Sequence, residues 1–589
     1  MKKTYINGHI FVGDSEDHFA NGMIVENGRI KWIGNDPVPE GETINLQGQT
    51  VLPGLIDCHT HPKYIADALH GVACTPPNVN SIKEMQEALR KSPAYGKGED
   101  VWIEGWGFDE TKLAEHRSPN RDDLDAVSTT QPIFIYRSDC HSSVGNSKAL
   151  ELAGIDENTP DPVGGKIERF ADGRPTGFMR EVAASQLLIR AKSAQSYEGD
   201  VQNMVKSSEH YLANGLVAIG EMMGRMKPYT SLKLYQDAIK GGFAPKASIY
   251  YVFDEIDPEK GLQPSGDAKL RVAGIKVFMD GSISGETAFN ADPYPSGKMG
   301  VSLTSKEKLT RAVNMARENK LQLAVHAMGD QAIQTVIDVT KDLDPWLDEM
   351  PSVRIEHASL MSDEMFTEIA HSKMKYALVT QPIFFFAEVE SYRHYLNAEQ
   401  FKLAYRVKTM LNSKAMLSLS SDAPCTPWAE PDSPFYSIYA AVTRKAANGD
   451  VVNANEAITV PQAVLGYTRD GAKIGGFDDN GTLEAGKAAD FVILNKDIFT
   501  VPHNELQTVR VKETWMAGKR FLKIKYLTLK KAGICSWPFG FGTCWSSRQH
   551  ILNVLRPSFL ELANSFLGAS RLRQEKLLAF RKLFGAKAL

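Results

Sequence analysis

Short apolar runs alternate with polar or amphipathic segments along most of the chain. Most of these runs lack a regular alternation of apolar and polar residues, which is typical of parallel strands that are covered on both faces. Eight buried strands with helical segments between them predict an α/β fold built on a (β/α)8 TIM-type barrel. The eight runs lie at residues 52–57, 216–220, 247–252, 273–279, 321–326, 353–357, 376–380 and 415–420.

Both flanks of this central region show a different pattern. In residues 4–50 and 483–524, apolar and polar positions alternate between Gly, Asn and Asp residues, as in small sheets. We expect the two flanks to form one small composite β-sandwich, with two separate β-hairpins as the alternative. The stretch of about 65–210, between the first two runs, is expected to hold an insertion subdomain.

These patterns divide the chain into four parts. They are a first sandwich segment at 1–52, the barrel with its insertion at 53–480, a second sandwich segment at 481–524 and a basic tail at 525–589.

Charge is distributed unevenly between these parts. The 589 residues include 67 basic and 71 acidic side chains, a net charge of −4, and this near balance argues against nucleic-acid binding. Residues 525–589 hold 11 Lys and Arg against 2 Asp and Glu, a net of +9, which leaves −13 for the rest. The basic amphipathic pattern of the tail would suit a partner or a membrane surface. Its lack of Asp favours an appended sequence without an assigned role.

Cysteine spacing and hydropathy bear on the cell compartment. Six cysteines without a CxxC pair do not make a disulfide framework, so reduced thiols are the expectation. The N-terminus lacks the apolar core of a signal peptide, and no run approaches the length of about 18 apolar residues that a membrane span needs. We therefore expect a cytoplasmic protein without a membrane span.

Two histidines follow the first apolar run, in the segment GLIDCHTH. His59 and His61 are two residues apart, so on a strand their side chains face the same way. The C-terminal strand ends of a (β/α)8 barrel form the mouth of its active site. Neutral imidazoles are common metal ligands, and an HxH pair can reach one ion.

Later runs end in the same kinds of residue. Lys276 lies within an otherwise apolar strand, where burying an ammonium group is costly unless it is paired or modified. His326 and His357 each close a run, and Asp422 follows the eighth. Each of these residues alone is more often structural, but five agreeing strand ends favour a metal site.

These residues and the segments around them resemble a known family. The chain looks like the metal-dependent amidohydrolase superfamily, and most closely like the amidohydrolase-3 (YtcJ-like) family, which includes the N-substituted formamide deformylases. The resemblance runs from about residue 4 to 520. It rests on VLPGLIDCHTH, GWGFDE, SDCHSSVGNSKAL, GRPTGFMRE, GIKVFMDGS, VHAMGDQAI, RIEHA, QPIF, SSDAP and GTLEAGKAADFVIL.

The resemblance implies one or two zinc ions and a set of ligands. His59 and His61 would hold the more buried metal, and His326 and His357 the other. Lys276 would bridge them as a carboxylated lysine. Asp422 would be both a ligand and a proton shuttle. The resemblance also suggests a homodimer.

Further candidates lie on the substrate side of the expected site. Trp106 and Asp109 in GWGFDE, and Gln381 in TQPIF, are expected near the substrate. His141 is expected to donate to a substrate carbonyl, with a structural role in its loop as an equal alternative. Asp280 is expected to support or cap the loop after the fourth run.

The sequence favours a hydrolase that cleaves a non-peptide C–N bond, of an amide or N-substituted formamide, by metal-activated water. The substrate would be a small molecule. The chain has no GxxxxGK[ST] segment and no GxSxG elbow, so nucleotide binding and serine hydrolysis lack support. Two alternatives stay open: a non-catalytic regulatory or ligand-binding protein on the same barrel, and a deaminase or cyclic-amide hydrolase.

Overall fold

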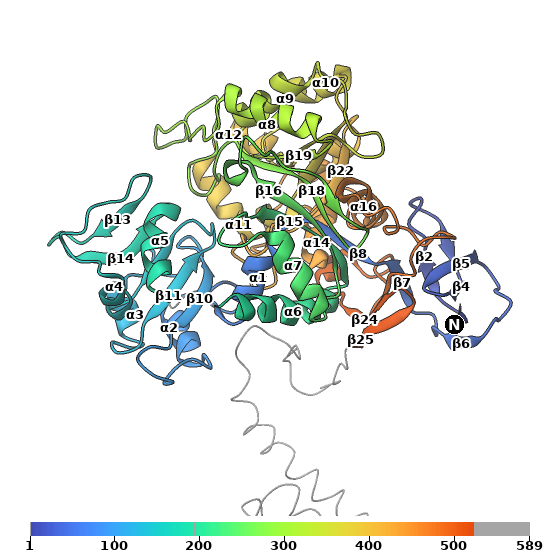
Figure 1. Cartoon of the computed structure of the whole chain (residues 1–589), viewed down its shortest axis with the longest axis horizontal. Helices are drawn as coiled ribbons and strands as arrows, with labels where there is room; N and C mark the ends of the chain where they lie inside the picture. Colours follow the sequence, from blue (N-terminus) through green and yellow to red (C-terminus); the bar gives the residue numbers. More distant parts are fainter. Residues whose placement is uncertain (1, 193–195, 524–589) are drawn as a thin grey trace, which may run out of the picture. The chain divides into compact units, whose positions relative to one another are not determined.

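Eight parallel strands form a nearly closed barrel at the centre of the fold (Figure 1). The computed structural model describes residues 2–192 and 196–523, so the tail expected at 525–589 lies outside the described residues. Neighbouring strands are hydrogen-bonded along the series from β8 to β22. The strands are β8 (Leu55–Thr60), β15 (Leu216–Gly224), β16 (Lys246–Val252), β18 (Leu270–Phe278), β19 (Gln322–Ala327), β20 (Val353–His357), β21 (Tyr376–Thr380) and β22 (Met416–Leu419).

Each of the eight predicted runs supplies one barrel strand, so the predicted α/β fold with a TIM-type barrel is confirmed. The segment after the last strand returns to the first strand at the C-terminal mouth. There the Asp422 N–H donates to the carbonyl oxygen of His59 over 2.9 Å, and the His61 N–H donates to that of Ala423 over 2.9 Å. Residues that the sequence marks as candidate ligands therefore also join the two ends of the barrel.

Helices around the barrel begin at side-chain caps. Ser305 accepts a hydrogen bond from the Lys308 N–H at the start of α8 (Lys306–Glu318). The buried side chains of α8 recur every three or four residues, so one face packs on the strands. The remaining helices of this region are α1 (Pro62–Ala68), α6 (Tyr197–Ala213), α7 (Ser231–Lys240), α9 (Asp330–Thr340), α10 (Asp363–His371), α11 (Pro382–Tyr395), α12 (Ala398–Leu403), α13 (Val407–Leu411), α14 (Pro434–Thr443), α15 (Val460–Gly466) and α16 (Arg469–Gly475).

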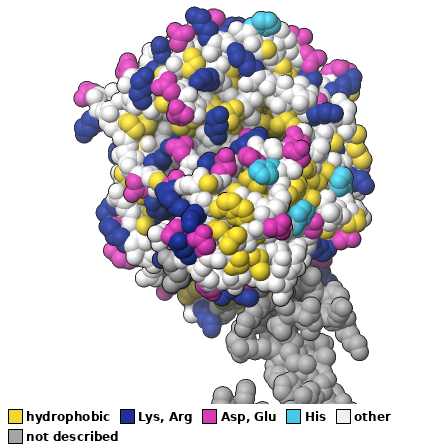
Figure 2. Space-filling model, turned by 90° about the vertical axis from the view of Figure 1, so that its right-hand side faces the viewer, with side chains coloured by type: hydrophobic (Ala, Val, Ile, Leu, Met, Phe, Trp, Pro, Cys, Tyr) yellow, Lys and Arg dark blue, Asp and Glu magenta, His cyan; other side chains and the backbone are white. Residues whose placement is uncertain are grey.

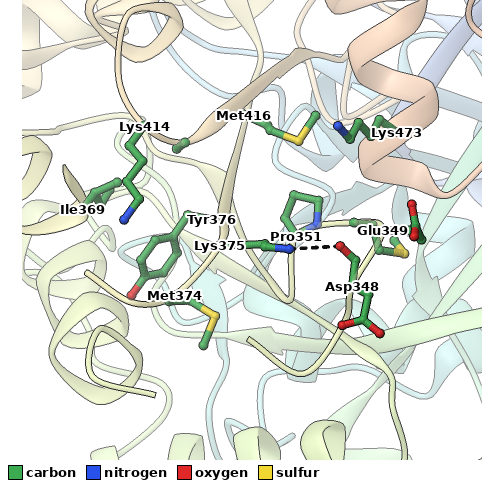
Figure 3. Close-up of a pocket in the computed structure, with 12 residues that line it drawn as sticks. Asp348, Glu349, Pro351, Ile369, Met374, Lys375, Tyr376, Lys414, Met416 and Lys473 are labelled. Carbon is green, nitrogen blue, oxygen red and sulfur yellow. Dashed lines mark hydrogen bonds between the residues drawn. The ribbon is translucent and has the colours of Figure 1, made fainter. Parts of the chain in front are cut away.

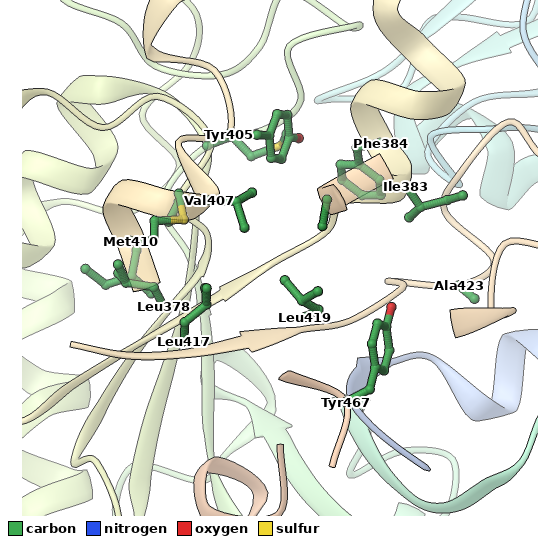
Figure 4. Close-up of a cluster of buried hydrophobic side chains, with 14 of the residues drawn as sticks. Leu378, Ile383, Phe384, Tyr405, Val407, Met410, Leu417, Leu419, Ala423 and Tyr467 are labelled. Atoms are coloured by element: carbon green, nitrogen blue, oxygen red, sulfur yellow. The ribbon is translucent and has the colours of Figure 1, made fainter. Parts of the chain in front are cut away.

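An apolar core fills the space between the strands and these helices. Leu378 of β21 and Leu417 of β22 lie close to Val407 and Met410 of α13 (Figure 4). All four side chains are buried. This packing holds the two last strands of the barrel, which lead directly to the mouth.

The segment between β8 and β15 forms a second sheet with its own core. Its strand order is β13, β14, β12, β11, β10, β9, and Ile103, Phe108 and Ile135 are among its core side chains. This insertion contacts the barrel at α11, where Lys112 pairs with Glu390. Its elements are β9 (Val72–Ala73), α2 (Ile82–Arg90), β10 (Ile103–Phe108), α3 (Arg121–Asp125), β11 (Ile133–Arg137), β12 (Ser143–Gly145), α4 (Ser147–Ala153), β13 (Lys166–Arg169), β14 (Pro175–Arg180) and α5 (Glu181–Ala191).

Strands from both ends of the described chain meet in one sheet, with the order β25, β24, β23, β7, β2, β3. A four-stranded sheet, β5, β4, β1, β6, shares its core. Tyr5 of the smaller sheet contacts Phe491 of the larger one edge-on, with ring centroids 5.3 Å apart. The strands are β1 (Lys2–Ile6), β2 (His9–Phe11), β3 (Phe19–Ala20), β4 (Gly22–Glu26), β5 (Arg29–Gly34), β6 (Glu42–Asn45), β7 (Thr50–Pro53), β23 (Phe491–Leu494), β24 (Val511–Met516) and β25 (Lys519–Lys523).

Figure 2 shows one face of the protein, on which acidic and basic side chains are interspersed with small apolar areas. Among the described helices, none is both long enough and apolar enough to cross a bilayer.

A Gly220→Ala substitution is expected to disturb the contact between β8 and β15 beside the mouth. A methyl group at this position would lie 2.2 Å from the carbonyl oxygen of Cys58, so the two strands would have to separate. We expect the free energy of unfolding to fall by about 1–3 kcal/mol, as for other overpacked sites, in urea denaturation. In the control Gly71→Ala the nearest atom would be 3.3 Å away. An equal loss of stability in both variants would contradict this expectation.

Candidate metal centre

Six side chains with ligand or charged groups gather at the C-terminal mouth of the barrel. They come from the ends of five strands, in agreement with where the sequence analysis expects them. Five of the six are buried, and His326 is the partly exposed one. They are His59 and His61 at the end of β8, Lys276 in β18, His326 in β19, His357 at the end of β20, and Asp422 beyond β22.

The carboxylate of Asp422 joins the two histidines of the HxH motif. Its Oδ1 lies 2.8 Å from His61 Nε2 and 3.1 Å from His59 Nε2. Burial alone would raise the pKa of Asp422, but the charges and hydrogen bonds of His59 and His61 hold that pKa well below its ordinary value. The backbone of Asp422 has a φ of +56°, a left-handed conformation that Asp adopts more readily than most residues. The fold therefore presents an ionised carboxylate in a fixed place.

His326 and His357 form a second pair on the neighbouring strands. Their ring centroids are 4.4 Å apart. Burial lowers the pKa of His357 to about 3. Burial also holds the pKa of His326 well below its ordinary value, and the neighbouring His357 and Lys276 lower it further. Both imidazoles are thus neutral at pH 7, which is the form that binds metal ions.

Lys276 is buried without a hydrogen-bond partner among the described residues. Its Nζ lies over the ring of Phe278, 5.0 Å from the centroid. Burial lowers the pKa of Lys276 to about 8, although the charges of Glu356 and Asp422 act in the opposite direction. A substantial fraction of this amine is therefore neutral and nucleophilic near pH 8.

The residues at the mouth fit a divalent metal ion. His59, His357 and Asp422 each offer a ligand atom, and these three atoms lie within 4.8 Å of one another. This spacing is close to that of ligands around one ion at about 2 Å. Lys276 Nζ and His61 Nδ1 are buried without a hydrogen-bond partner among the described residues. Burying such unpaired nitrogen atoms costs free energy, because buried polar atoms are normally hydrogen-bonded. A bound metal ion or modification would remove that cost.

A buried Arg–Glu pair, which is not among the site residues predicted from the sequence, orients His59. Glu356 accepts hydrogen bonds from Arg354 Nε over 2.7 Å and from His59 Nδ1 over 2.5 Å. Burial would raise the pKa of Glu356, but Arg354 and His59 hold it below its ordinary value. The contact fixes the ring of His59 so that Nε2 faces Asp422, 3.1 Å from its Oδ1, in the way that carboxylate partners orient metal-binding histidines.

Arg354 also ties this arrangement to the barrel. Its guanidinium donates to the carbonyl oxygen of Cys58 over 2.9 Å and to the hydroxyl of Tyr250 over 3.0 Å. Both Arg354 and Glu356 lie on β20, two residues apart, so they share one face of the strand. That spacing of two charges in a buried strand is the signal that the sequence offers for them.

Two aspartates hold backbone groups next to the cluster, and Asp280 Oδ1 also lies 3.5 Å from His326 Nε2. Asp280 accepts the N–H groups of Met328, Gly329 and Phe289 over 3.1, 2.8 and 2.9 Å. It therefore fixes the start of α9, which follows β19, and burial raises its pKa to about 7. Asp57 accepts the His59 N–H over 3.2 Å.

Gln381 supports the second histidine pair. It precedes α11, is fully buried, and its Oε1 lies 2.8 Å from His357 Nδ1. Its Nε2 donates to Ser420 Oγ over 2.8 Å. These contacts fix the ring orientation of His357. They also use both the oxygen and the nitrogen of the Gln381 side-chain amide.

The three substrate-side residues predicted in the insertion each contact different neighbours. Asp109 is buried, and its Oδ1 accepts the N–H of Thr111 over 2.8 Å. Trp106 packs with alanines of the insertion and of the loop after β22. His141 is about half exposed, with its Nδ1 3.3 Å from Glu181 Oε2. Burial would lower the pKa of His141, but Glu181 and Asp139 raise it overall.

A cysteine lies beside the HxH motif. A ligand atom of His61, one of Asp422 and the Sγ of Cys425 lie within 4.8 Å of one another. From the sequence, Cys425 is expected only to be a reduced thiol. Its position three residues after Asp422 is the signal that connects it to the mouth.

A surface hollow of 320 Å³ lies at the opposite end of the strands (Figure 3). Lys375 and Lys414, which precede β21 and β22, line it, and Lys375 Nζ donates to the carbonyl oxygen of Asp348 over 3.0 Å. Because the barrel histidines lie at the other strand ends, this hollow is separate from the cluster.

A (β/α)8 barrel with histidines, a lysine and an aspartate at its C-terminal strand ends has the architecture of a metal-dependent hydrolase. The chain belongs to the amidohydrolase family, whose family model matches residues 42–521. The resemblance stated from the sequence is thereby confirmed.

Relatives align over nearly their whole length. The N-substituted formamide deformylase of Arthrobacter pascens is 29% identical over 537 residues, which are 87% of this chain and 97% of the relative. The YtcJ amidohydrolase of Bacillus subtilis (strain 168) is 28% identical over 88% of this chain and 99% of its own. The solved structure of an uncharacterized metal-dependent hydrolase from Pyrococcus horikoshii has a TM-score of 0.68 at 27% identity, covering 86% of this chain and 99% of that one.

A Glu356→Gln substitution is expected to weaken metal binding about 10–100-fold, as loss of a histidine's carboxylate partner does. The amide can no longer attract the Nδ1 proton of His59 as a carboxylate does. Calorimetric titration of metal-free protein with zinc measures the effect, with the exposed Glu87→Gln as a matched control. Thermal melting checks the fold, since Arg354 loses its partner. Wild-type affinity in a folded Glu356→Gln variant would contradict the positioning role.

Proposed function

We propose that the protein is a zinc-dependent hydrolase that cleaves a non-peptide C–N bond in a small amide, such as an N-substituted formamide. The contact of one buried carboxylate, Asp422, with both histidines of the HxH motif carries this proposal. The name of the Arthrobacter relative supports the substrate class.

The proposed centre holds one or two zinc ions. Bound zinc supplies Lewis-acid chemistry, activating water and polarising a carbonyl group. Neutral imidazoles and a carboxylate are suitable donors for it. The proposed ligands are His59, His61, His326, His357 and Asp422, with Lys276 carboxylated on Nζ as a further, bridging ligand.

Asp422 is the proposed proton carrier. Its carboxylate would accept the proton of the attacking water and then donate it to the leaving nitrogen, so that an acid and an amine are released. Its fixed backbone and its two histidine contacts keep the oxygen in one place through both transfers. Glu356 holds His59 and Gln381 holds His357 during these steps.

The insertion is proposed to provide the substrate side of the site. His141 would donate to the substrate carbonyl, and Trp106 and Asp109 would contact the part of the substrate beyond the scissile bond. Gln381 would contribute from the barrel side, chiefly by orienting His357.

The organisation expected from the sequence also remains a proposal. It comprises sandwich segments at 1–52 and 481–524, a hydrolase barrel at 53–480 and a separate tail at 525–589. The cysteine pattern supports a cytoplasmic location, and the family resemblance supports a homodimer.

An Asp422→Asn variant is expected to keep zinc but lose about 10²–10⁴-fold in hydrolysis, the usual range for a lost general acid–base group. Asn tolerates the left-handed backbone of this position. Amine release from a panel of N-substituted formamides measures activity, and elemental analysis measures zinc. The exposed Asp342→Asn is the matched control. Full activity in Asp422→Asn would refute the proton role, and release of ammonia by the wild type would favour a deaminase.

A Lys276→Ala variant is expected to bind less zinc per chain, because the proposed carbamate ligand is lost. A small carboxylic acid such as propionate can enter the vacated space, so we expect it to restore part of the zinc content. Inductively coupled plasma mass spectrometry measures the metal. The control is Lys375→Ala, at the opposite strand ends. Unchanged zinc content in Lys276→Ala would contradict a bridging role.

A further inference from the structure

Two cysteines outside the proposed ligand set lie side by side at the mouth of the barrel. Cys140 belongs to the insertion, in the loop between β11 and β12, and Cys425 lies in the loop after β22. Their Sγ atoms are 3.3 Å apart, although 285 positions separate them in the sequence. Both are free thiols.

Solvent reaches this pair of thiols. Cys140 and Cys425 are partly exposed, whereas Cys58 and Cys74 are buried. Cys58 instead donates to Ser418 Oγ inside the barrel, over 3.3 Å. Among the described cysteines, a dissolved oxidant can therefore reach the pair at the mouth most easily.

Hydrogen-bonded turns hold the backbone on both sides of the cysteine pair. In the insertion, Asp139 Oδ1 accepts the N–H groups of His141 and Ser142 over 2.9 and 3.0 Å. On the barrel side, the Cys425 N–H donates to the carbonyl oxygen of Asp422 over 2.9 Å. Two anchored turns therefore keep the thiols close together, and a disulfide requires the sulfurs to approach from 3.3 Å to about 2.0 Å.

We propose that Cys140 and Cys425 form a reversible disulfide that ties the insertion to the loop that carries Asp422. One thiolate attacks a small disulfide such as oxidised glutathione, forms a mixed disulfide and releases one reduced glutathione. The second thiolate attacks the protein sulfur of the mixed disulfide, forms the Sγ–Sγ bond and releases the second glutathione. The two cysteines lose two protons and two electrons in total, and oxidised glutathione takes them up.

The bond would alter the surroundings of the metal centre. The thiol of Cys425 lies with His61 and Asp422 in one group of potential donors. Oxidation converts that thiol into a disulfide sulfur, a poorer donor, and fixes the turn that carries His141. The redox state of the pair would thus be linked to the mouth of the barrel.

Peptide mapping of the full-length protein tests the proposal. The protein is incubated with oxidised glutathione, alkylated, digested without reduction and analysed by mass spectrometry. We expect a cross-linked peptide pair containing Cys140 and Cys425, which dithiothreitol converts back to two alkylatable cysteines. Alkylation of both cysteines after oxidation, or a separate glutathione on each, would overturn the proposal.

Serine variants supply the controls. Cys140→Ser should abolish the cross-linked peptide and leave Cys425 with glutathione or the alkylating reagent, whereas Cys544→Ser should retain the cross-link. The bond should also raise the melting temperature of the wild type by several degrees and leave that of Cys140→Ser unchanged, because it constrains the unfolded chain. An equal rise in the melting temperature of Cys140→Ser on oxidation would refute the assignment. None of these readouts requires a substrate, so their failure would leave the proposed hydrolysis untouched.

Discussion

The seam between the first strand of the barrel and the segment after its last strand is the constraint on which the site depends. At this seam the Asp422 N–H bonds to the backbone of His59, and the Asp422 carboxylate contacts both His59 and His61. The same residues thus join the two ends of the barrel and arrange the ligand atoms. A displacement of either strand would change both together, so the geometry of the cluster is as rigid as the barrel itself.

The cost of burying charged groups explains how the other charged side chains at the mouth of the barrel are arranged. An unpaired charge in a protein interior is costly, and its partners must be close and well oriented. Glu356 has such partners in Arg354 and His59, whereas Lys276 has no hydrogen-bond partner among the described side chains. Buried charged groups at this site are therefore of two kinds, those with hydrogen-bond partners and those without. The Arg–Glu pair is complete and serves as scaffold, while the lysine is incomplete and fits the role of a residue that awaits a ligand or a modification.

The sequence predicts the barrel and its strand-end residues because both depend on local patterns. A strand that is buried on two faces lacks the alternation of apolar and polar residues seen in half-exposed strands. Parallel strands also bring their C-terminal ends together. The run at 353–357 is predicted, but the roles of Arg354 and Glu356 are missed because their contacts with Cys58, Tyr250 and His59 are made to other strands. The contact of Gln381 with His357 and the position of Cys425 beside the HxH motif join segments that meet only in the folded barrel. Such contacts leave no periodic signal in one sequence.

The sheet that joins both ends of the described chain has a consequence for biosynthesis. Val51 of β7 lies opposite Ile493 of β23, about 440 residues later. Ribosomes add about 5–20 residues per second, so this edge of β7 lacks its partner for roughly 20–90 s after it is made. An unpaired edge can pair with other chains during that time. Until β23 has been synthesised, this edge of β7 therefore remains open to pairing with other chains.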